Sequence, residues 1–184
     1  LRGLPAPNRD DPRIDLAEAK LARRDWDSER ALKAAKAAEI KGWKLGESQV
    51  VARALAFRGE SAEIMGQLDE AIDLFRQAGA LFEKSGNQAE VARMSFASGV
   101  VLGDQGHFDQ AQKQFEAGLQ IAQQLGSNHL AATQLSGLGL LRQARGELGP
   151  ARSLLEKAYT FYKETGDQAF ELRTTYFLAQ LLWQ

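Results

Sequence analysis

The sequence "GQLDEAIDLF" at residues 66–75 returns forty residues later as "GHFDQAQKQF" (106–115) and again as "GELGPARSLL" (146–155). Each copy starts with glycine, has Leu or Phe two residues later and has alanine five residues later. The same interval of forty separates four further sets of small residues: Gly46, Gly86, Gly126 and Gly166; Gly59, Gly99 and Gly139; Ala31, Ala71, Ala111 and Ala151; Ala78, Gly118 and Ala158. A fixed interval of this length indicates a protein built from repeated structural units.

Each repeat unit reads as two helices, A and B, separated by turns. Apolar residues recur at three- and four-residue steps, as in Leu68, Ala71, Ile72 and Phe75, which is the pattern of an amphipathic helix. Glycines close the helices at both turns, where a left-handed conformation is expected. Ser127 and Asp167 are predicted N-caps of A helices, as are Asn87 and Asn128. Asp69 and Asp109 are predicted N-caps of B helices.

Glycine also lies in the middle of the A helices, at residues 59, 99 and 139. Glycine is unfavourable in a helix, so we expect these positions to be crossing points where a neighbouring backbone comes close. Phe75, Phe115 and Leu155 of the B helices would interlock around them. A single helix pair cannot bury both of its faces, and stacking of the pairs would therefore give a continuous right-handed solenoid.

Both ends of the chain depart from the repeat. The Pro-rich residues 1–12 read as a linker, and the repeat domain is expected over 13–184, in units of about 13–46, 47–86, 87–126, 127–166 and a partial 167–184. Trp26 is predicted to occupy the place of Leu68 and Phe108, with two extra residues absorbed in the first unit. The final helix A has no helix B after it, which leaves Phe177 and Leu181 short of partners. Either further units follow, or this edge pairs with a second copy.

Composition argues against several function classes. The chain has 23 basic and 24 acidic residues without a basic tract, so neither nucleic acid nor a membrane surface is an expected partner. It has no cysteine and two histidines, so no metal site or cofactor is expected, and His107 and His129 are interpreted as solvated or locally bonded. No catalytic constellation appears, and we expect a cytoplasmic protein that is not an enzyme.

Gly99, Gly106, Phe108, Ala111, Phe115 and Gly118 together resemble the tetratricopeptide pattern. The resemblance implies an all-α fold, a right-handed superhelical solenoid of antiparallel helix pairs with about four and a half repeats. The forty-residue form is similar to repeats of kinesin light chains and cell-polarity adaptors, and to the tails of large bacterial signalling proteins. It also implies that the A helices line a concave groove that recognises peptides or helices of partner proteins.

Helical spacing predicts which side chains face that groove. The predicted contact residues are Arg53, Glu60, Glu63, Arg93, Phe96, Val100, Thr133, Ser136, Gln143, Arg173, Tyr176 and Gln180. Arg53, Arg93 and Arg173 form a ladder that suits an acidic or C-terminally anchored peptide. Alternatively, each arginine pairs with a nearby acid, such as Glu90 for Arg93, Glu47 or Glu60 for Arg53, and Glu171 for Arg173. The asparagines that grip the peptide backbone in related forty-residue repeats are absent here.

Two functions remain open from the sequence. The chain is either a non-catalytic scaffold that binds a peptide or helix of another protein, or a structural or regulatory segment of a larger signalling protein. In the second case it would self-associate, as a homodimer, through Phe177 and Leu181 of the terminal helix.

Overall fold

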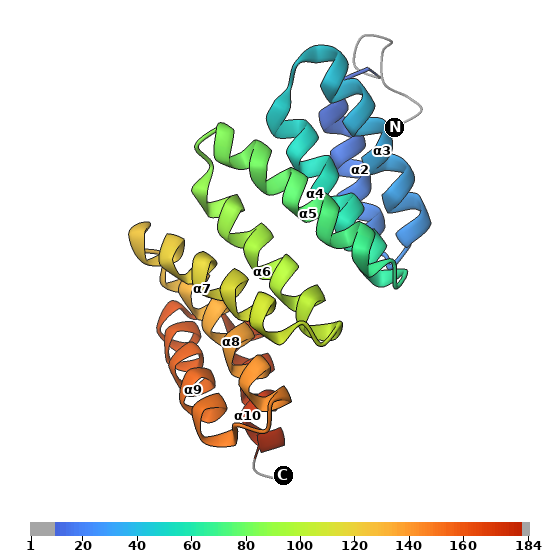
Figure 1. Cartoon of the computed structure of the whole chain (residues 1–184). Helices are drawn as coiled ribbons and strands as arrows, with labels where there is room; N and C mark the ends of the chain where they lie inside the picture. The colour runs from blue at the N-terminus through green and yellow to red at the C-terminus, as the bar shows by residue number, and fades with distance from the viewer. Residues whose placement is uncertain (1–9, 182–184) are drawn as a thin grey trace. The chain divides into compact units, whose positions relative to one another are not determined.

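The computed structural model describes residues 10–181, which form helices joined by short turns and no strand (Figure 1). The predicted all-α class is therefore confirmed. Residues 1–9 of the predicted linker and 182–184 of the last unit lie outside the described residues. The helices are α2 (Pro12–Arg24), α3 (Ser28–Leu45), α4 (Ser48–Ile64), α5 (Leu68–Lys84), α6 (Gln88–Asp104), α7 (Phe108–Gln124), α8 (Asn128–Ala144), α9 (Leu148–Thr165) and α10 (Gln168–Leu181).

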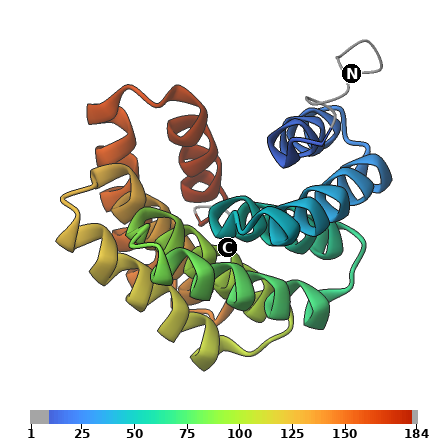
Figure 2. The ribbon, with the colours of Figure 1, turned by 90° about the horizontal axis from the view of Figure 1, so that it is seen from above.

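The chain divides into two compact units, Leu1–Asn87 and Gln88–Gln184. In the first unit α2 packs against α3, α3 against α4 and α4 against α5, and α2 also contacts α4. In the second unit α6 packs against α7, α7 against α8, α8 against α9 and α9 against α10, and α8 contacts both α6 and α10. Within each unit, consecutive helices thus form antiparallel pairs (Figures 1 and 2). The even-numbered helices are the A helices of the repeat, and within each unit they contact one another.

Glycine closes the predicted turns in the left-handed conformation. Positive φ angles between 62° and 79° occur at Gly46, Gly66, Gly86, Gly106, Gly126, Gly146 and Gly166. Backbone hydrogen bonds then tie the next residue back to the helix, as where the Gln67 N–H donates to the Ala62 carbonyl oxygen at 2.8 Å. This is the Schellman pattern, which satisfies carbonyl groups at the helix end. Both predicted sets of turn glycines are confirmed.

The predicted N-caps are partly confirmed. The Ser127 hydroxyl accepts a hydrogen bond from the Leu130 N–H, and the Asp167 carboxylate accepts one from the Phe170 N–H, each at 3.4 Å. Asn128, however, is the first residue of α8 rather than its cap.

The caps predicted for the B helices are wrong. Gln67 and His107 occupy the N-cap positions of α5 and α7, and neither side chain makes a capping hydrogen bond. Asp69 and Asp109 lie inside the first turn of these helices, where a carboxylate interacts favourably with the helix dipole.

The mid-helix glycines accept side chains from the following B helix. A Cβ atom at Gly59 would lie 2.5 Å from Phe75 Cε1, and one at Gly99 would lie 2.6 Å from Phe115 Cε1. At Gly139 the nearest atom is Leu155 Cγ, at 2.8 Å. The predicted crossing points are thus confirmed in place. At Gly59 and Gly99 the close neighbour is an aromatic ring rather than a backbone. At Gly139 the predicted backbone approach is also present, since the Ala151 carbonyl oxygen would lie 3.3 Å from the Cβ atom.

The prediction for Trp26 is wrong. Helix α2 ends at Arg24 and α3 begins at Ser28, so Trp26 lies in the turn with φ of 59°. Forty residues later the equivalent residue is Gly66, and Ser28 is the equivalent of Leu68. The first turn therefore has the same length as the others. The Trp26 side chain is 86% exposed instead of packed.

Of the two residues predicted as a free terminal edge, Leu181 instead lies in the core and Phe177 is partly buried beside it. Leu181 is 9% exposed and packs with Ala151 and Leu155 of α9, and Phe177 packs against the same cluster. The exposed large side chains of α10 are Leu172, at 73%, and Tyr176, at 61%. Side chains at 177 and 181 point toward α9 because they share one side of α10, four residues apart.

Candidate functional site

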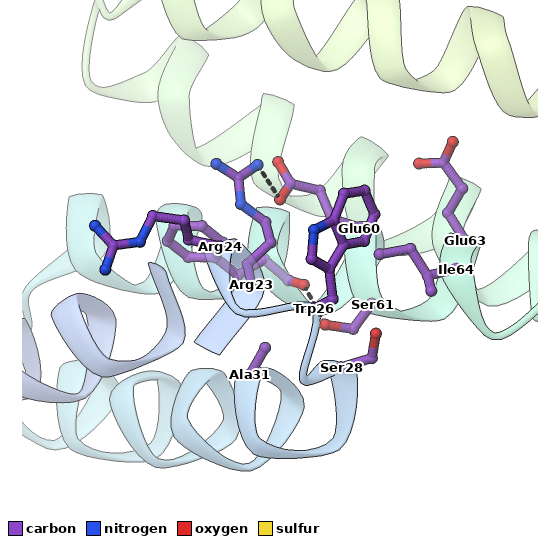
Figure 3. A pocket seen from close by; sticks show the side chains of 10 residues that line it. Arg23, Arg24, Trp26, Ser28, Ala31, Glu60, Ser61, Glu63 and Ile64 are labelled. Atoms are coloured by element: carbon purple, nitrogen blue, oxygen red, sulfur yellow. Dashed lines mark hydrogen bonds and ion pairs between the residues drawn. The ribbon is translucent and has the colours of Figure 1, made fainter. Parts of the chain in front are cut away.

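The first unit contains a pocket of about 530 Å³ where the C-terminal ends of α2 and α4 meet the turn before α3 (Figure 3). We call it the Trp26 pocket. It is lined by Arg23, Arg24, Trp26, Ser28, Ala31, Phe57, Glu60, Ser61, Glu63 and Ile64. Glu60 and Glu63 were predicted to face the groove, whereas the α2 and turn residues were not.

An ion pair crosses this pocket between α2 and α4. Arg23 Nη1 lies 2.7 Å from Glu60 Oε2, and the Arg23 guanidinium carbon lies 5.5 Å from the centre of the Phe57 ring. The arginine is thus held by a carboxylate and an aromatic face together. Because their charges compensate each other, neither Arg23 nor Glu60 presents a free charge to a ligand.

The apolar part of the pocket is exposed. Ile64 is 58% exposed, and Figure 3 shows the Trp26 indole reaching from the turn toward α4, beside Glu60 and Ile64. Ser61 is 3% exposed, and its hydroxyl donates to the Phe57 carbonyl oxygen at 2.9 Å. The hydroxyl of Ser61 is therefore already used inside the helix, and the open wall of the pocket is formed by indole and aliphatic carbon.

Arg24 carries the loosely held charge of the pocket. Its Nε lies 3.8 Å from Asp25 Oδ1, and the two side chains are 78% and 51% exposed. An exposed pair at this distance contributes little to stability, since solvent screens it. Arg24 is therefore able to reorient toward an incoming carboxylate at small cost.

Arg53 makes no ion pair, hydrogen bond or ring contact with any described residue, and its side chain is exposed. Both of the acids that the sequence offered to it have other arginine partners. Glu47 lies 2.9 Å from Arg13, and Glu60 pairs with Arg23. Arg13 stands forty residues before Arg53 and is 66% exposed, so it is a further member of the ladder. The forty-residue interval was the signal that could have identified it.

In the second unit the two remaining arginines have weak partners. Arg93 Nε lies 3.9 Å from Glu90 Oε2, and the Arg93 side chain is 59% exposed. The predicted local pair is therefore present, although long. The Arg173 guanidinium lies over the Phe170 ring, 4.4 Å from its centre, instead of beside Glu171. In both cases the guanidinium retains exposed N–H groups that a partner can use.

The other predicted contact residues of the second unit differ in exposure. Tyr176 and Gln180 are exposed, whereas Phe96, Val100, Thr133 and Gln143 are partly buried. Thr133 Oγ1 accepts a hydrogen bond from the Tyr162 hydroxyl at 3.2 Å, so it supports α9. Ser136 is 3% exposed and lies in the helix packing, so we do not retain it as a contact residue.

The two histidines make local contacts. His129 Nδ1 lies 3.4 Å from Asp167 Oδ2, and its ring meets Tyr162 and Phe170 edge-on. His107 is exposed at the N-cap of α7. Over residues 10–181, no cluster of three or more His, Asp or Glu side chains is arranged to hold a metal ion. None of the described helices combines the length and apolar character that a membrane span requires.

The fold and the repeated sequence define the class of protein. The family model of the tetratricopeptide repeat matches residues 50–124 and, in a second register, 90–164. These matches together cover more than half of the chain. The chain belongs to the tetratricopeptide repeat (TPR) family.

Solved structures show the same helical repeat solenoid. The apo form of RapI has 19% sequence identity and a TM-score of 0.74, over 91% of this chain and 46% of that one. A Rap protein complexed with competence and sporulation factor has 17% identity and a TM-score of 0.76, over 89% and 46%. A putative kinesin light chain of Podosopora anserina has 16% identity and a TM-score of 0.70, over 92% and 84%.

These identities establish likeness of fold alone. The chain spans about half the length of the Rap proteins that it matches. A search of curated protein sequences gives no match.

Proposed function

We propose that this chain is a non-catalytic protein-interaction scaffold that holds a peptide or helix of a partner protein against the exposed sides of its A helices. The observation that supports the proposal is that three exposed arginines are only weakly paired. Arg53, Arg93 and Arg173 recur at repeat positions, are exposed, and have a distant partner, an aromatic partner or none among the described residues. Planar guanidinium groups suit carboxylates, so the A helices of each unit are suited to an acidic partner chain.

The structural neighbours support a partner of this kind. One of them is a Rap protein complexed with competence and sporulation factor, and its fold matches 89% of this chain. No resident cofactor or metal is part of the proposal, and the protein would act in the cytoplasm by binding alone. Glu60 is engaged with Arg23, so the proposed partner is acidic rather than basic.

Reversing the arginine charges tests the scaffold. Peptides selected from a phage-displayed random library against the immobilised chain should be rich in Asp and Glu. The variant Arg53→Glu/Arg93→Glu/Arg173→Glu should bind them about 100-fold more weakly while remaining helical, since each lost or reversed charge contact costs about 1 kcal/mol or more. Fluorescence anisotropy measures the affinities, and circular dichroism checks the fold.

The matched control changes the same charge on the B helices. Arg76, Lys113 and Arg152 are all exposed, so Arg76→Glu/Lys113→Glu/Arg152→Glu alters net charge equally without touching the A helices. It should bind the selected peptides within about threefold of the unmodified chain. If both triple variants lose affinity equally, only net charge matters, and the proposed A-helix surface is wrong.

A second candidate function is favoured by the exposed face of α10. Ala132 and Ser136 of α8 are 0% and 3% exposed, whereas their equivalents forty residues later, Leu172 and Tyr176, are 73% and 61% exposed. At α8 this surface is covered by α9 and α10. An equivalent but uncovered apolar surface at α10 is suited to another helix pair, so the chain would self-associate there within a larger structural or regulatory protein.

Solution mass tests self-association. Sedimentation equilibrium of the chain should show a dimer that becomes a monomer in Leu172→Glu/Tyr176→Glu, because carboxylates cannot be buried unpaired in an apolar interface. A monomer at all concentrations up to about 1 mM would reject self-association, because the dissociation constant of any dimer would then lie above about 1 mM.

A further inference from the structure

Trp26 is the only non-glycine residue with positive φ among residues 10–181. The three equivalent turns all have glycine at this position, namely Gly66, Gly106 and Gly146. A tryptophan is disfavoured there, because its Cβ crowds the backbone in the left-handed region. Compared with glycine, a tryptophan at this position therefore lowers the stability of the turn.

The indole does not compensate by packing into the core. It is 86% exposed, although a large aromatic side chain normally buries most of its surface. It stands instead at the edge of the Trp26 pocket, facing Ile64, which is 58% exposed. An unfavourable backbone conformation that displays an aromatic ring beside a pocket is typical of a binding position.

The pocket has the size and composition to hold one side chain of a partner. Its volume of about 530 Å³ exceeds that of any single side chain, and Phe57, Ala31 and Ile64 supply apolar carbon. Apolar surface of this type gains free energy when a ligand removes it from water. The indole N–H of Trp26 adds a hydrogen-bond donor at the edge.

The charges around the pocket indicate which residue should stand next to the bound apolar side chain in the partner protein. Arg23 and Glu60 lie 2.7 Å apart and neutralise each other. Arg24 is 78% exposed and is held only by a contact of 3.8 Å to Asp25. Glu63 also lines the pocket, but it is engaged in an interaction of its own, so Arg24 is the most loosely held charge there. A positive charge at the pocket edge complements a carboxylate.

We propose that the Trp26 pocket binds a large apolar side chain of a partner protein that stands next to a carboxylate, with the indole stacked on the apolar group and Arg24 paired with the acid. This inference deepens the proposed scaffold function by naming an anchor in the first unit. It does not depend on the arginine ladder, because none of Arg53, Arg93 and Arg173 lines the pocket.

Amide and indole NMR of the isotope-labelled chain tests the anchor with three small probes. They are N-acetyl-Phe-Glu-amide, N-acetyl-Phe-Lys-amide and N-acetyl-Ala-Glu-amide. The first should shift the Trp26 indole N–H signal with a Kd of about 1–10 mM, as expected for one side chain and one charge. The second should bind about threefold more weakly or worse, and the third should cause no shift at the same concentrations.

Two variants and one control complete the test. Trp26→Gly restores the glycine of the other turns, so it should raise the denaturation midpoint and weaken binding of the Phe-Glu probe by about tenfold or more. Arg24→Glu should reverse the preference between the Glu and Lys probes. Trp43→Ala removes another exposed tryptophan, 56% exposed and outside the pocket, and should bind as the unmodified chain does.

The outcomes separate this anchor from the wider scaffold. The proposal is overturned if no probe shifts the Trp26 signal at about 10 mM, a concentration that detects even single-anchor contacts. It is also overturned if Trp26→Gly binds the Phe-Glu probe unchanged, or if the Lys probe binds equally well. A Trp26 shift that depends on protein concentration alone would assign the pocket to a second copy of the chain. The phage-selected peptides test the scaffold separately, through variants that leave this pocket intact.

Discussion

The ring of Phe115 lies against Gly99 so closely that a Cβ atom at residue 99 would stand 2.6 Å from Phe115 Cε1. Gly137 of α8 approaches the same ring from another side, with a distance of 2.5 Å from its would-be Cβ to the same carbon. Phe115 is 2% exposed. One aromatic side chain of α7 therefore joins two A helices, and glycine on both of them makes the room.

Gly99→Ala should destabilise the protein by about 1–3 kcal/mol, because the added methyl group forces the buried Phe115 ring to move. Gly103→Ala in α6 is the matched control, since the nearest atom to its would-be Cβ is Leu141 Cδ1, at an ordinary distance of 4.0 Å. There alanine should stabilise the helix by up to about 1 kcal/mol. Urea denaturation measures both free energies of unfolding. A Gly99→Ala protein as stable as the unmodified chain would show that the ring is not held there.

Trp26→Gly should stabilise the protein by about 1 kcal/mol, because glycine removes the steric cost of φ at 59°. The reverse change at the equivalent turn, Gly66→Ala, should destabilise by about the same amount. The Gly66 site has open space around it and φ of 74°, so only the backbone conformation is affected. Differential scanning calorimetry compares the two variants. Loss of stability in Trp26→Gly would contradict the left-handed turn.

Glu39→Gln should destabilise the protein by about 1–2 kcal/mol. Glu39 Oε2 lies 2.6 Å from Arg58 Nη1, and both side chains are only 19% exposed. Without this carboxylate, Arg58 keeps only the longer contact of 3.5 Å to Glu70, so a poorly solvated cation loses its main partner.

Glu156→Gln is the control for that ion pair. The Glu156 pair with Arg152 is 52% and 60% exposed, and its loss should cost less than about 0.5 kcal/mol. Equal losses of unfolding free energy in the two variants would show that burial does not strengthen the Arg58 pair.

Gln134→Met should change stability by less than about 1 kcal/mol, whereas Gln134→Ala should lower it by about 2 kcal/mol or more. Gln134 is fully buried, and its Nε2 donates to the Ala92 carbonyl oxygen of α6 at 2.9 Å. Its Oε1 accepts no hydrogen bond from the described residues. Methionine keeps the volume and removes an unsatisfied acceptor, but alanine leaves a cavity. A Met variant as unstable as the Ala variant would mean that the hydrogen bond dominates.

Leu181→Asp should destabilise the protein by about 2–4 kcal/mol, because it places a carboxylate in the cluster with Ala151 and Leu155. Leu172→Asp, on the exposed side of the same helix, should change stability by less than about 0.5 kcal/mol in dilute solution. Thermal denaturation at low protein concentration compares the two. The opposite order would show that α10 is rotated, with Leu172 toward α9.

The forty-residue interval and the three- and four-residue spacing of apolar residues together predicted the helices, both glycine turns and the contact of each mid-helix glycine with the next B helix. These features repeat because each depends on residues close together in sequence, and a helix period or a left-handed glycine needs little else. The amino-acid sequence also placed Arg53, Arg93 and Arg173 at one helical position. It could not assign their partners, since Glu47 and Glu60 are both within seven residues of Arg53 along the chain yet pair with arginines of α2.

Only the tertiary structure decided which side chains are exposed. It showed that the Trp26 side chain is exposed beside a pocket, and that Phe177 and Leu181 of α10 face inward while Leu172 and Tyr176 are exposed. Periodicity gives the relative positions of residues on one helix but leaves undetermined how that helix is rotated against its neighbours. That rotation depends on packing between residues distant in sequence, where the free energy of burial is gained once the helices meet.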